Sequence, residues 1–472
     1  MRFAISGTNS EVAYLMKPLT WSQIAEWSGG LLLQGTPAET VAALSTDTRS
    51  LKGGELFVAL KGEKFDAHEF LEQALQAPAP LAGMLLHDLP VETESFRGAI
   101  VRVKDTLSGL QHLARHYRRE LGIPIVGITG SSGKTSTKDL VRGVLAQRWR
   151  VLATKGNLNN HIGVPLTLLS MDATTEAGVV EMGMNHSGEI EVLAEIAAPD
   201  GAIITNVGVA HIENLGSREA IALEKGMLAE AIEPGGWVIL PAQDDFTESI
   251  RARCRAEVLT GGVETGDVQA RNLEIGWDGV KFDLSFGGES VPSFIPVPAE
   301  HMVRNATLAA AAGLRMGLSL SEAAAGLSQI ELTGGRLQRK TVAGIAFIDD
   351  SYNANPESVK AALRTLRQLP VAGRRIAVLG RMAELGDHAL EQHVLVGRAA
   401  AENGIDILVG IGEEGAQLAS GAAGAVDTHV FADQAQVAAF LREHAAGEDL
   451  VLLKGSRSAR METVLSYLNE GI

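Results

Sequence analysis

A run of glycines followed by a lysine and a threonine is the part of this sequence with the clearest chemistry. We interpret the stretch from Gly127 to Gly133-Lys134-Thr135 as a phosphate-binding loop. Its glycines let backbone N–H groups approach a triphosphate, and a following helix would add the positive end of its dipole. Lys134 would neutralise the β- and γ-phosphates, and the Thr135 hydroxyl would bind Mg²⁺. The stretch predicts that the protein binds ATP or GTP.

The residues on either side have the patterns of the strand and helix that such a loop needs. Residues 123–128 are apolar and largely β-branched, which favours a buried strand. From Thr137 onward, apolar residues recur at helical spacing. Because strand, loop and helix follow in the required order, a chance match in a glycine-rich chain is the weaker alternative. We expect the nucleotide to contact Gly130, Ser131, Ser132, Gly133, Lys134, Thr135 and Ser136.

Three further polar residues follow predicted strands, and the first, Glu181, ends a strand where an α/β sheet usually places its ligands. The apolar run 177–182 contains Glu181 at its end, and a carboxylate there can hold Mg²⁺. A strand over 202–207 leads into a loop with His211, and a helix over 217–231 carries Lys225. On pattern alone, His211 is also compatible with polar surface and Lys225 with a solvated helix.

Two polar segments could bind ligands or could be ordinary loops. Asn157, Asn159 and Asn160 lie in a loop where asparagines either cap their own backbone or bind a ligand, and both remain open. Earlier in the chain, Arg49, Lys61 and Lys64 could meet a phosphate, and Asp66 and His68 a sugar or base. The alternative there is a solvated loop with an Arg–Asp pair.

Composition excludes several classes of function. The 472 residues suffice for about three domains. Lys and Arg number 41 against 57 Asp and Glu, a net charge of −16 that argues against nucleic acid as a partner. The single cysteine, Cys254, expected half-buried on a helix, excludes an intrachain disulfide and a thiolate cluster. Without a signal peptide in the first ten residues or a long apolar run, we expect a soluble, cytoplasmic protein with no membrane insertion.

The expected fold class is α/β with three domains. Residues 1–121 would form a mixed α/β domain, with a strand over 56–60 and a helix over 107–121. Residues 122–334 would form a doubly wound domain around the phosphate-binding loop, decorated by an antiparallel hairpin over 268–286. A helix over 301–314 would carry Asn305. Residues 335–472 would form a Rossmann-like domain.

The last domain has its own polar strand ends. Strands are expected over 345–350, 375–379, 405–409 and 450–453, and Asn355 should cap a helix that begins with Pro356. Lys454 and Arg457 follow the last strand and could reach a cleft. The run G-I-G-E-E-G at 410–415 matches a dinucleotide fingerprint, but its two glutamates would repel a pyrophosphate, so NAD is not expected.

The motifs together resemble the Mur ligases, the ATP-dependent amide ligases of peptidoglycan precursor synthesis. The matching stretches lie between Ser45 and Glu462: T-G-S-S-G-K-T-S, G-N-L-N-N-H-I-G-V-P-L-T-L-L, E-M-G-M-N-H-S-G-E-I, N-V-G-V-A-H-I-E, D-D-S-Y-N-A-N-P, M-A-E-L-G and K-G-S-R-S-A-R-M-E. The elements N-L-N-N, D-D-S-Y-N-A-N-P and F-D-A-H look most like the member type that adds D-alanyl-D-alanine to UDP-N-acetylmuramoyl-tripeptide. The resemblance implies a monomer that uses ATP and two Mg²⁺ ions and forms an acyl phosphate.

The resemblance also implies roles for single residues. Lys134, His211 and Lys225 would be catalytic, and Thr135, Glu181, His211 and a carbamylated Lys225 would bind metal. Asn305, Arg336 and Asp350 would face adenine, phosphate and ribose. The UDP end of the substrate would contact Thr48, Arg49, Lys61, Asp66 and His68. Its muramoyl-peptide end would contact Asn157, Asn159, Asn160, Asn185 and His186. Two positions depart from the family's pattern. Met302 stands where the family usually has an asparagine, and Arg381 stands where it usually has an aspartate.

Other functions remain open. A ligase that adds a single amino acid, such as another Mur type or a folylpolyglutamate synthetase, would differ in acceptor preference. A regulatory ATPase or switch with this loop would hydrolyse nucleotide without a second substrate. A non-enzymatic binding module would leave Glu181, His211 and Lys225 without a role.

Overall fold

The computed structural model describes residues 13–62, 65–89 and 91–470. Lys64 and the N-terminal ten residues considered above lie outside these ranges. The chain divides into two compact units. The first unit comprises residues 1–125, 150–182 and 192–199, and the second unit comprises residues 126–149, 183–191 and 200–472.

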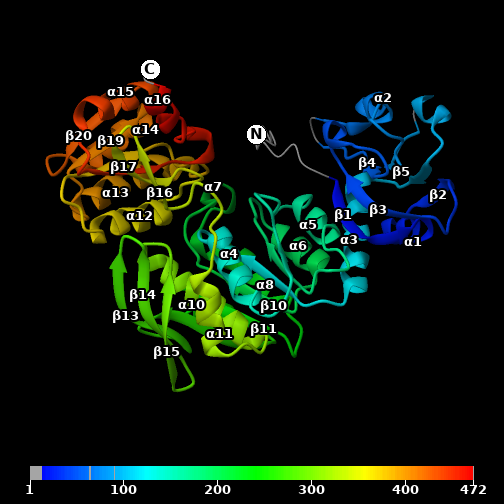
Figure 1. Cartoon of the computed structure of the whole chain (residues 1–472), viewed down its shortest axis with the longest axis horizontal. Helices are drawn as coiled ribbons and strands as arrows, with labels where there is room; N and C mark the ends of the chain where they lie inside the picture. Colours follow the sequence, from blue (N-terminus) through cyan, green and yellow to red (C-terminus); the bar gives the residue numbers. More distant parts are fainter. Residues whose placement is uncertain (1–12, 63–64, 90, 471–472) are drawn as a thin grey trace. The chain divides into compact units, whose positions relative to one another are not determined.

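The first unit contains a six-stranded mixed sheet with the strand order β1-β3-β4-β5-β6-β2. Phe57, Met84 and Leu86 pack against Leu71 on one face, where α2 lies, while α1 and α3 lie on the other (Figure 1). The bounds are β1 Tyr14–Thr20, α1 Trp21–Ser28, β2 Leu31–Gln34, β3 Thr40–Ser45, β4 Leu56–Val58, α2 Leu71–Leu75, β5 Gly83–Leu86, β6 Ala99–Arg102 and α3 Thr106–Leu121. The strand expected over 56–60 therefore ends two residues early.

The remaining part of the first unit is a parallel strand pair with a short helix. β8 (Val151–Ala153) pairs with β9 (Ala177–Glu181), and α5 (Gly163–Leu169) connects them. The buried Tyr117 of α3 ties this part to β1, because its hydroxyl accepts a hydrogen bond from the Lys17 amide and donates one to the Met171 carbonyl.

The second unit begins with strands that run in the order β15-β14-β13-β12-β11-β10-β7. The four pairs from β7 to β13 are parallel, and β13, β14 and β15 form an antiparallel meander. The expected hairpin at Asp278-Gly279 is confirmed, since β13 and β14 flank it. The bounds are β7 Ile125–Thr129, β10 Gly201–Ile204, β11 Trp237–Pro241, β12 Glu257–Val263, β13 Val268–Gly276, β14 Gly279–Phe286 and β15 Glu289–Ile295.

Helices α4 and α10 pack together beside this sheet (Figure 1). α4 begins directly at Lys134, three residues before the apolar pattern becomes helical. Cys254 lies beyond the end of α9 and not on a helix as expected, although it is half-buried. The bounds are α4 Lys134–Leu145, α6 Glu189–Ala197, α7 Ile212–Leu215, α8 Arg218–Glu230, α9 Thr247–Arg251, α10 Glu300–Arg315 and α11 Leu320–Ser328.

The second unit ends in another six-stranded sheet, ordered β16-β17-β21-β18-β19-β20 and parallel except at β16. Phe440 of α15 and Val464 of α16 pack on one face. Asn355 caps α12 with Pro356 at its start, which confirms the prediction. The bounds are β16 Gln338–Val342, β17 Ile345–Asp350, α12 Pro356–Gln368, β18 Arg375–Leu379, α13 Ala389–Glu402, β19 Ile407–Ile411, α14 Gly412–Ala422, β20 Asp427–Phe431, α15 Gln434–His444, β21 Leu450–Lys454 and α16 Thr463–Glu470.

Strand β10 is shorter than the sequence predicts. The apolar pattern suggests a strand to Val207, but the strand ends at Ile204. Beyond it, the Thr205 hydroxyl donates to the Ser132 carbonyl, and the Val207 amide donates to the Asp244 carboxylate. The Thr205 amide still donates to the Thr129 carbonyl of β7, but the next carbonyl, of Asn206, accepts from the Ser131 amide of the loop, and the Val207 amide faces Asp244, so the ladder ends here. Among the described residues, no helix combines the length and apolarity that crossing a membrane requires.

Candidate functional site

The loop between β7 and α4 has the backbone conformation that its glycines allow. Gly130 has φ 151° and Gly133 has φ 76°. A Cβ on Gly130 would lie 1.8 Å from the Thr205 hydroxyl, so only glycine fits there. Gly127 lies inside β7, and five residues separate it from Gly133, one more than the usual loop spacing. The prediction that Gly127 opens the loop is therefore wrong, and Gly130 has this role.

The loop that follows β10 supports the phosphate-binding loop that follows β7. β7 and β10 are parallel and in register, with Thr129 opposite Ile204, so the loops that follow them lie side by side. The amides of Ser131 and Ser132 donate to the backbone carbonyl and side-chain oxygen of Asn206, over 3.0 and 2.8 Å. The sequence reasoning did not select Asn206, although it falls in the quoted N-V-G-V-A-H stretch.

The start of α4 is built to face an anion. Gly133 is its N-cap and provides no side-chain hydrogen bond, so no capping carboxylate or hydroxyl competes for the first turn. The Lys134 ammonium donates to the Gly130 carbonyl at 2.8 Å and thus folds back over the loop. Asn305 of α10 lies beside Gly133, because a Cβ there would be 3.0 Å from its side-chain nitrogen. Lys134, Gly133 and Asn305 are therefore brought together as predicted.

Arg336 reaches the same loop from the segment that precedes β16. Its guanidinium donates to the Thr135 hydroxyl at 2.9 Å and lies over the Tyr352 ring, 4.3 Å from the centroid. Its Nε atom is buried and, within the described part of the chain, has no hydrogen-bond partner. A buried guanidinium donor beside a phosphate-binding loop fits a phosphate oxygen.

Four ionisable side chains from separate elements converge near the loop. Nδ1 of His211 lies 2.6 Å from the Glu384 carboxylate. Burial lowers the pKa of His211, the Glu384 contact opposes this, and the charges of Lys134 and Lys225 lower it further. The contact with His211 lowers the pKa of Glu384, burial opposes this, and Lys134 adds to the lowering. Glu384 is a site residue that the sequence reasoning missed.

Lys225 is a buried amine on α8. Its side chain is 1% exposed. Burial lowers its pKa well below the usual value, the charge of Lys134 lowers it further, and Glu224 opposes both. The solvated-helix interpretation is therefore wrong: α8 turns Lys225 inward. A buried amine whose pKa is lowered by a second lysine indicates a site that can accept negative charge.

Glu224, the neighbour of Lys225, holds the loop that carries Asn185 and His186. Its carboxylate accepts hydrogen bonds from the amides of Gly188 and Ile190, both at 2.8 Å, at the start of α6. Within this loop, Glu189 accepts from the Asn185 amide at 2.6 Å and lies 3.3 Å from Nδ1 of His186. α8 therefore positions both the Lys225 amine and this loop.

Asp350 and Lys454 end two neighbouring parallel strands. They are in register in β17 and β21, and the Lys454 ammonium donates to the Asp350 carboxylate at 2.5 Å. Lys454 is 2% exposed, so it contributes mainly to holding Asp350. Arg457 is exposed and pairs with Glu462 at 2.8 Å.

Glu181 lies in the first unit, buried at the end of β9. Its amide donates to the Thr154 hydroxyl at 2.9 Å, and one carboxylate oxygen accepts from the Asn159 side chain at 2.8 Å. Asn160 caps the next turn, since its oxygen accepts from the amides of Ile162 and Gly163. The Asn157 carbonyl accepts from the Asn159 amide. The loop thus has both a capping asparagine and one that orients a candidate metal ligand.

Asp66 organises the candidate UDP-binding residues of the first unit. It lies 3.2 Å from the Lys61 ammonium and 2.7 Å from Nδ1 of His68. Burial would raise the pKa of Asp66, but hydrogen bonds from His68 and Lys61 outweigh it and lower the pKa to about 2. Nε2 of His68 accepts from the His87 amide at 3.2 Å, so both ring nitrogens have partners. The His68 ring therefore acts mainly as a brace.

Arg49 and Thr48 are nearby in sequence and exposed. Arg49 pairs with Asp47 at 2.6 Å and its side chain is 73% exposed. The Thr48 hydroxyl donates to Gln73 at 2.9 Å. This is the geometry of the solvated Arg–Asp alternative, and the pair remains accessible to a ligand.

The two departures from the family's pattern have local partners. Met302 lies one turn before Asn305 on α10, and its sulfur accepts from the Asn305 side chain at 3.9 Å. Arg381 pairs at 3.3 Å with Glu414, in the first turn of α14. The glycines of the G-x-G-x-x-G run pack backbone to backbone, because a Cβ on Gly410 would lie 2.5 Å from Cα of Gly415.

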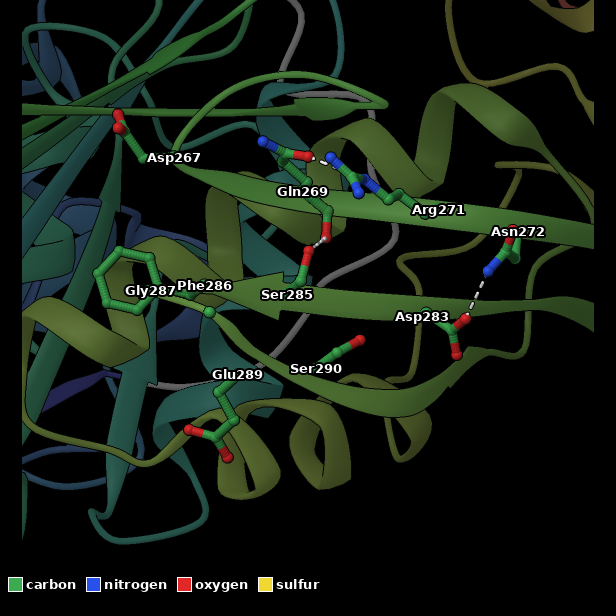
Figure 2. Close-up of a pocket in the computed structure, with 11 residues that line it drawn as sticks. Asp267, Gln269, Arg271, Asn272, Asp283, Ser285, Phe286, Gly287, Glu289 and Ser290 are labelled. Atoms are coloured by element: carbon green, nitrogen blue, oxygen red, sulfur yellow. Dashed lines mark hydrogen bonds between the residues drawn. The ribbon is translucent and has the colours of Figure 1, made fainter.

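A hollow of about 420 Å³ lies on the antiparallel strands β13–β15. Figure 2 shows its polar side chains paired locally, with Gln269 bonded to Arg271 and Asn272 to Asp283. None of the residues that line it belongs to the phosphate-binding loop. We therefore place no part of the candidate chemistry there.

Comparison with known proteins is consistent with this geometry. Residues 128–313 match the Mur ligase middle domain, and residues 335–457 match the Mur ligase, glutamate ligase domain. A UDP-N-acetylmuramoyl-tripeptide–D-alanyl-D-alanine ligase of Bacillus subtilis is 38% identical over 96% of this chain and 98% of its own length. A crystal structure of MurF from Acinetobacter baumannii is 34% identical with a TM-score of 0.89, covering 96% and 99% of the two chains. A MurF ligase from Thermotoga maritima in complex with ADP is 26% identical with a TM-score of 0.81, covering 90% and 97%.

Proposed function

Since this chain belongs to the Mur ligase family, we propose that it joins D-alanyl-D-alanine to UDP-N-acetylmuramoyl-tripeptide with ATP. The products are UDP-N-acetylmuramoyl-pentapeptide, ADP and phosphate. The observation that carries the proposal is the meeting of Lys134, Arg336 and Lys225 with His211 and Glu384 around one phosphate-binding loop. A nucleotide-binding protein without acyl chemistry has no use for Lys225, His211 and Glu384.

Residues in and around the loop are proposed to bind ATP. Gly130 and Gly133 allow the backbone to approach the phosphates, and Lys134 and Arg336 neutralise their charge. Asn305, which lies beside Gly133, is proposed to contact adenine, and Asp350, held by Lys454, is proposed to contact ribose. A related ligase from Thermotoga maritima was crystallised with ADP, which supports the use of an adenine nucleotide.

Three residues are proposed as magnesium ligands. Thr135 and Glu181 would supply a hydroxyl and a carboxylate, the oxygen donors that suit Mg²⁺, and His211 would supply an imidazole nitrogen. When bound, two Mg²⁺ ions would offset the phosphate charge during phosphoryl transfer. The hydrogen bond from Asn159 orients the Glu181 carboxylate for this task.

The chemistry proceeds in two displacements. The carboxylate of the tripeptide attacks the γ-phosphorus of ATP, ADP leaves, and an acyl phosphate forms. The amine of D-alanyl-D-alanine then attacks the acyl carbon, and inorganic phosphate leaves with the carboxylate's oxygen. Lys134 and Arg336 are proposed to supply the fixed positive charge that the migrating phosphoryl group needs. Excluding water protects the acyl phosphate from hydrolysis.

Lys225 is proposed to act as a carbamate. Burial and the lowered pKa favour the neutral form of the Lys225 amine, and a neutral amine adds CO₂ with loss of one proton. The product is an anionic oxygen ligand for the second Mg²⁺, and it would also balance the charge of Lys134. Lys225→Ala should lose activity that a short carboxylic acid restores. Full activity of Lys225→Ala without any added acid would refute this role.

The first unit is proposed to hold the UDP-muramoyl substrate. Its candidates for the UDP end are Thr48, Arg49, Lys61, Asp66 and His68, and for the muramoyl-peptide Asn157, Asn159 and Asn160. Asn185, His186 and Arg457 of the second unit would also contact substrate. We propose three functional domains at 1–121, 122–334 and 335–472, acting in a monomer.

A substrate-omission assay separates this function from its rivals. Phosphate release from Mg-ATP should require both UDP-N-acetylmuramoyl-tripeptide and D-alanyl-D-alanine. Release with a single amino acid in place of the dipeptide would favour a ligase that adds one amino acid. Release that is indifferent to both substrates would favour a regulatory ATPase.

A further inference from the structure

His211 and Glu384 share an unusual backbone conformation. They have φ 66° and 64°, in the left-handed region that residues other than glycine rarely adopt. His211 begins the short helix α7, and Glu384 lies in the loop after β18. Residues other than glycine keep such conformations only where the surrounding structure favours them strongly.

The two side chains meet although 173 positions separate them in the sequence. Nδ1 of His211 lies 2.6 Å from a carboxylate oxygen of Glu384, with side chains 17% and 30% exposed. Partial burial strengthens a charge-assisted contact of this kind. The Nδ1 atom is buried and, among the described residues, makes no hydrogen bond of good geometry, so the ion-pair contact with Glu384 is what holds this side of the ring, and Nε2 is its other functional atom.

Neighbouring contacts hold the His211 loop on both sides. The Val209 amide donates to the Glu357 carboxylate at 2.9 Å. Gly386, two residues after Glu384, lies so close to Glu213 that a Cβ there would be 2.9 Å from its Cγ. The segment with β17 and β18 therefore supplies residues that hold the loop before and after His211.

We propose that Glu384 is a positioning residue, which fixes the ring and tautomer of His211 from a segment that follows β18. Nδ1 carries the proton toward Glu384, and the lone pair of Nε2 is available to a metal ion. The proposal rests on the proposed function in one respect, the role of His211 as a metal ligand. Its consequence is that the metal site is complete only when this segment is docked on the His211 loop.

Two Glu384 variants and one control test the role without turnover. Glu384→Ala removes the contact, and Glu384→Gln keeps an oxygen that can accept from Nδ1. Glu391→Ala is the matched control, since its carboxylate is 69% exposed and lies 4.0 Å from His388. Mn²⁺ affinity is measured by electron paramagnetic resonance with a non-hydrolysable ATP analogue, and the His211 tautomer by ¹⁵N NMR, assigned with His211→Asn.

The proposal expects Glu384→Ala to weaken Mn²⁺ binding by about 10–100-fold and to lose the fixed tautomer. Glu384→Gln should stay within a few-fold of the unmodified protein, and Glu391→Ala should be unchanged. Unchanged Mn²⁺ affinity and tautomer in Glu384→Ala would overturn the proposal. If the unmodified protein binds no Mn²⁺, the metal role of His211 fails, and the tautomer alone then decides whether Glu384 positions the ring.

Discussion

The guanidinium of Arg336 donates a hydrogen bond to the hydroxyl of Thr135 across 2.9 Å. Thr135 belongs to the first turn of α4, and Arg336 to the segment that leads into β16. The contact places the guanidinium that precedes β16 on the phosphate-binding loop between β7 and α4. We infer that binding of Mg-ATP exchanges this contact for one between Arg336 and a phosphate oxygen.

Replacement of Arg336 by lysine should weaken ATP binding. Lysine keeps the charge but loses the planar fork and the stacking on Tyr352, so KM for ATP should rise about 10-fold with a smaller change in kcat. Arg339→Lys is a matched control, because Arg339 stacks on Trp277 at 4.9 Å and is exposed. Equal effects of the two substitutions on KM for ATP would show that Arg336 does not bind the nucleotide.

Lys134→Ala should abolish most catalysis without unfolding the protein. Its ammonium donates to the Gly130 carbonyl of a loop that other contacts also hold, so stability should change little. Loss of a fixed charge on a transferring phosphoryl group costs about 10²–10³-fold in kcat. Lys281→Ala, on the exposed side of β14, is the control. A turnover number within threefold of the control would contradict the proposed role.

Asp139→Ala should be strongly destabilising. Asp139 pairs with the buried Lys138 at 2.9 Å and accepts two hydrogen bonds from Thr333 at 2.9 Å. Removing one partner of a buried ion pair costs about 3–5 kcal/mol, and the two Thr333 donors also lose their acceptor. Urea unfolding should show this loss, and replacing both members, Lys138→Met with Asp139→Leu, should recover a large part of it. A double variant less stable than Asp139→Ala would count against the buried charge as the cause.

Stability should depend on His301 in mildly acidic solution. Burial lowers the pKa of His301 from 6.5 to about 3, and Arg304, Lys454 and Arg364 contribute. Between these values the unfolded chain binds a proton that the folded chain does not, so stability rises with pH from about 3 to about 6.5. His301→Gln should flatten this part of the pH profile of the urea midpoint. An unchanged slope would show that His301 is accessible to protons in the folded state.

Local patterns predicted the elements that local interactions decide. The strands 345–350 and 375–379 have the predicted bounds, because apolar β-branched runs between polar turns suffice to define them. Asn355 and Pro356 start α12 as predicted, since capping involves only residues a turn apart. The strand expected over 405–409 runs instead from Ile407 to Ile411, a shift typical of boundaries without a capping residue.

Residues whose role depends on distant partners could not be predicted in this way. The end of β10 is set by the backbone groups of Asn206 and Val207, which bond to other loops, and an apolar run does not reveal this. Glu384 lies in a quoted motif, but only the fold places it against His211. Lys454 is predicted at a cleft, yet the register of β17 and β21 pairs it with Asp350.

Transfer of an oxygen atom tests the central claim most directly. The tripeptide carboxylate would be labelled with oxygen-18, and the reaction run with ATP and D-alanyl-D-alanine. An acyl-phosphate route predicts that each released phosphate carries one labelled oxygen, together with pentapeptide product by mass spectrometry. Unlabelled phosphate would contradict the ligase mechanism proposed for this chain.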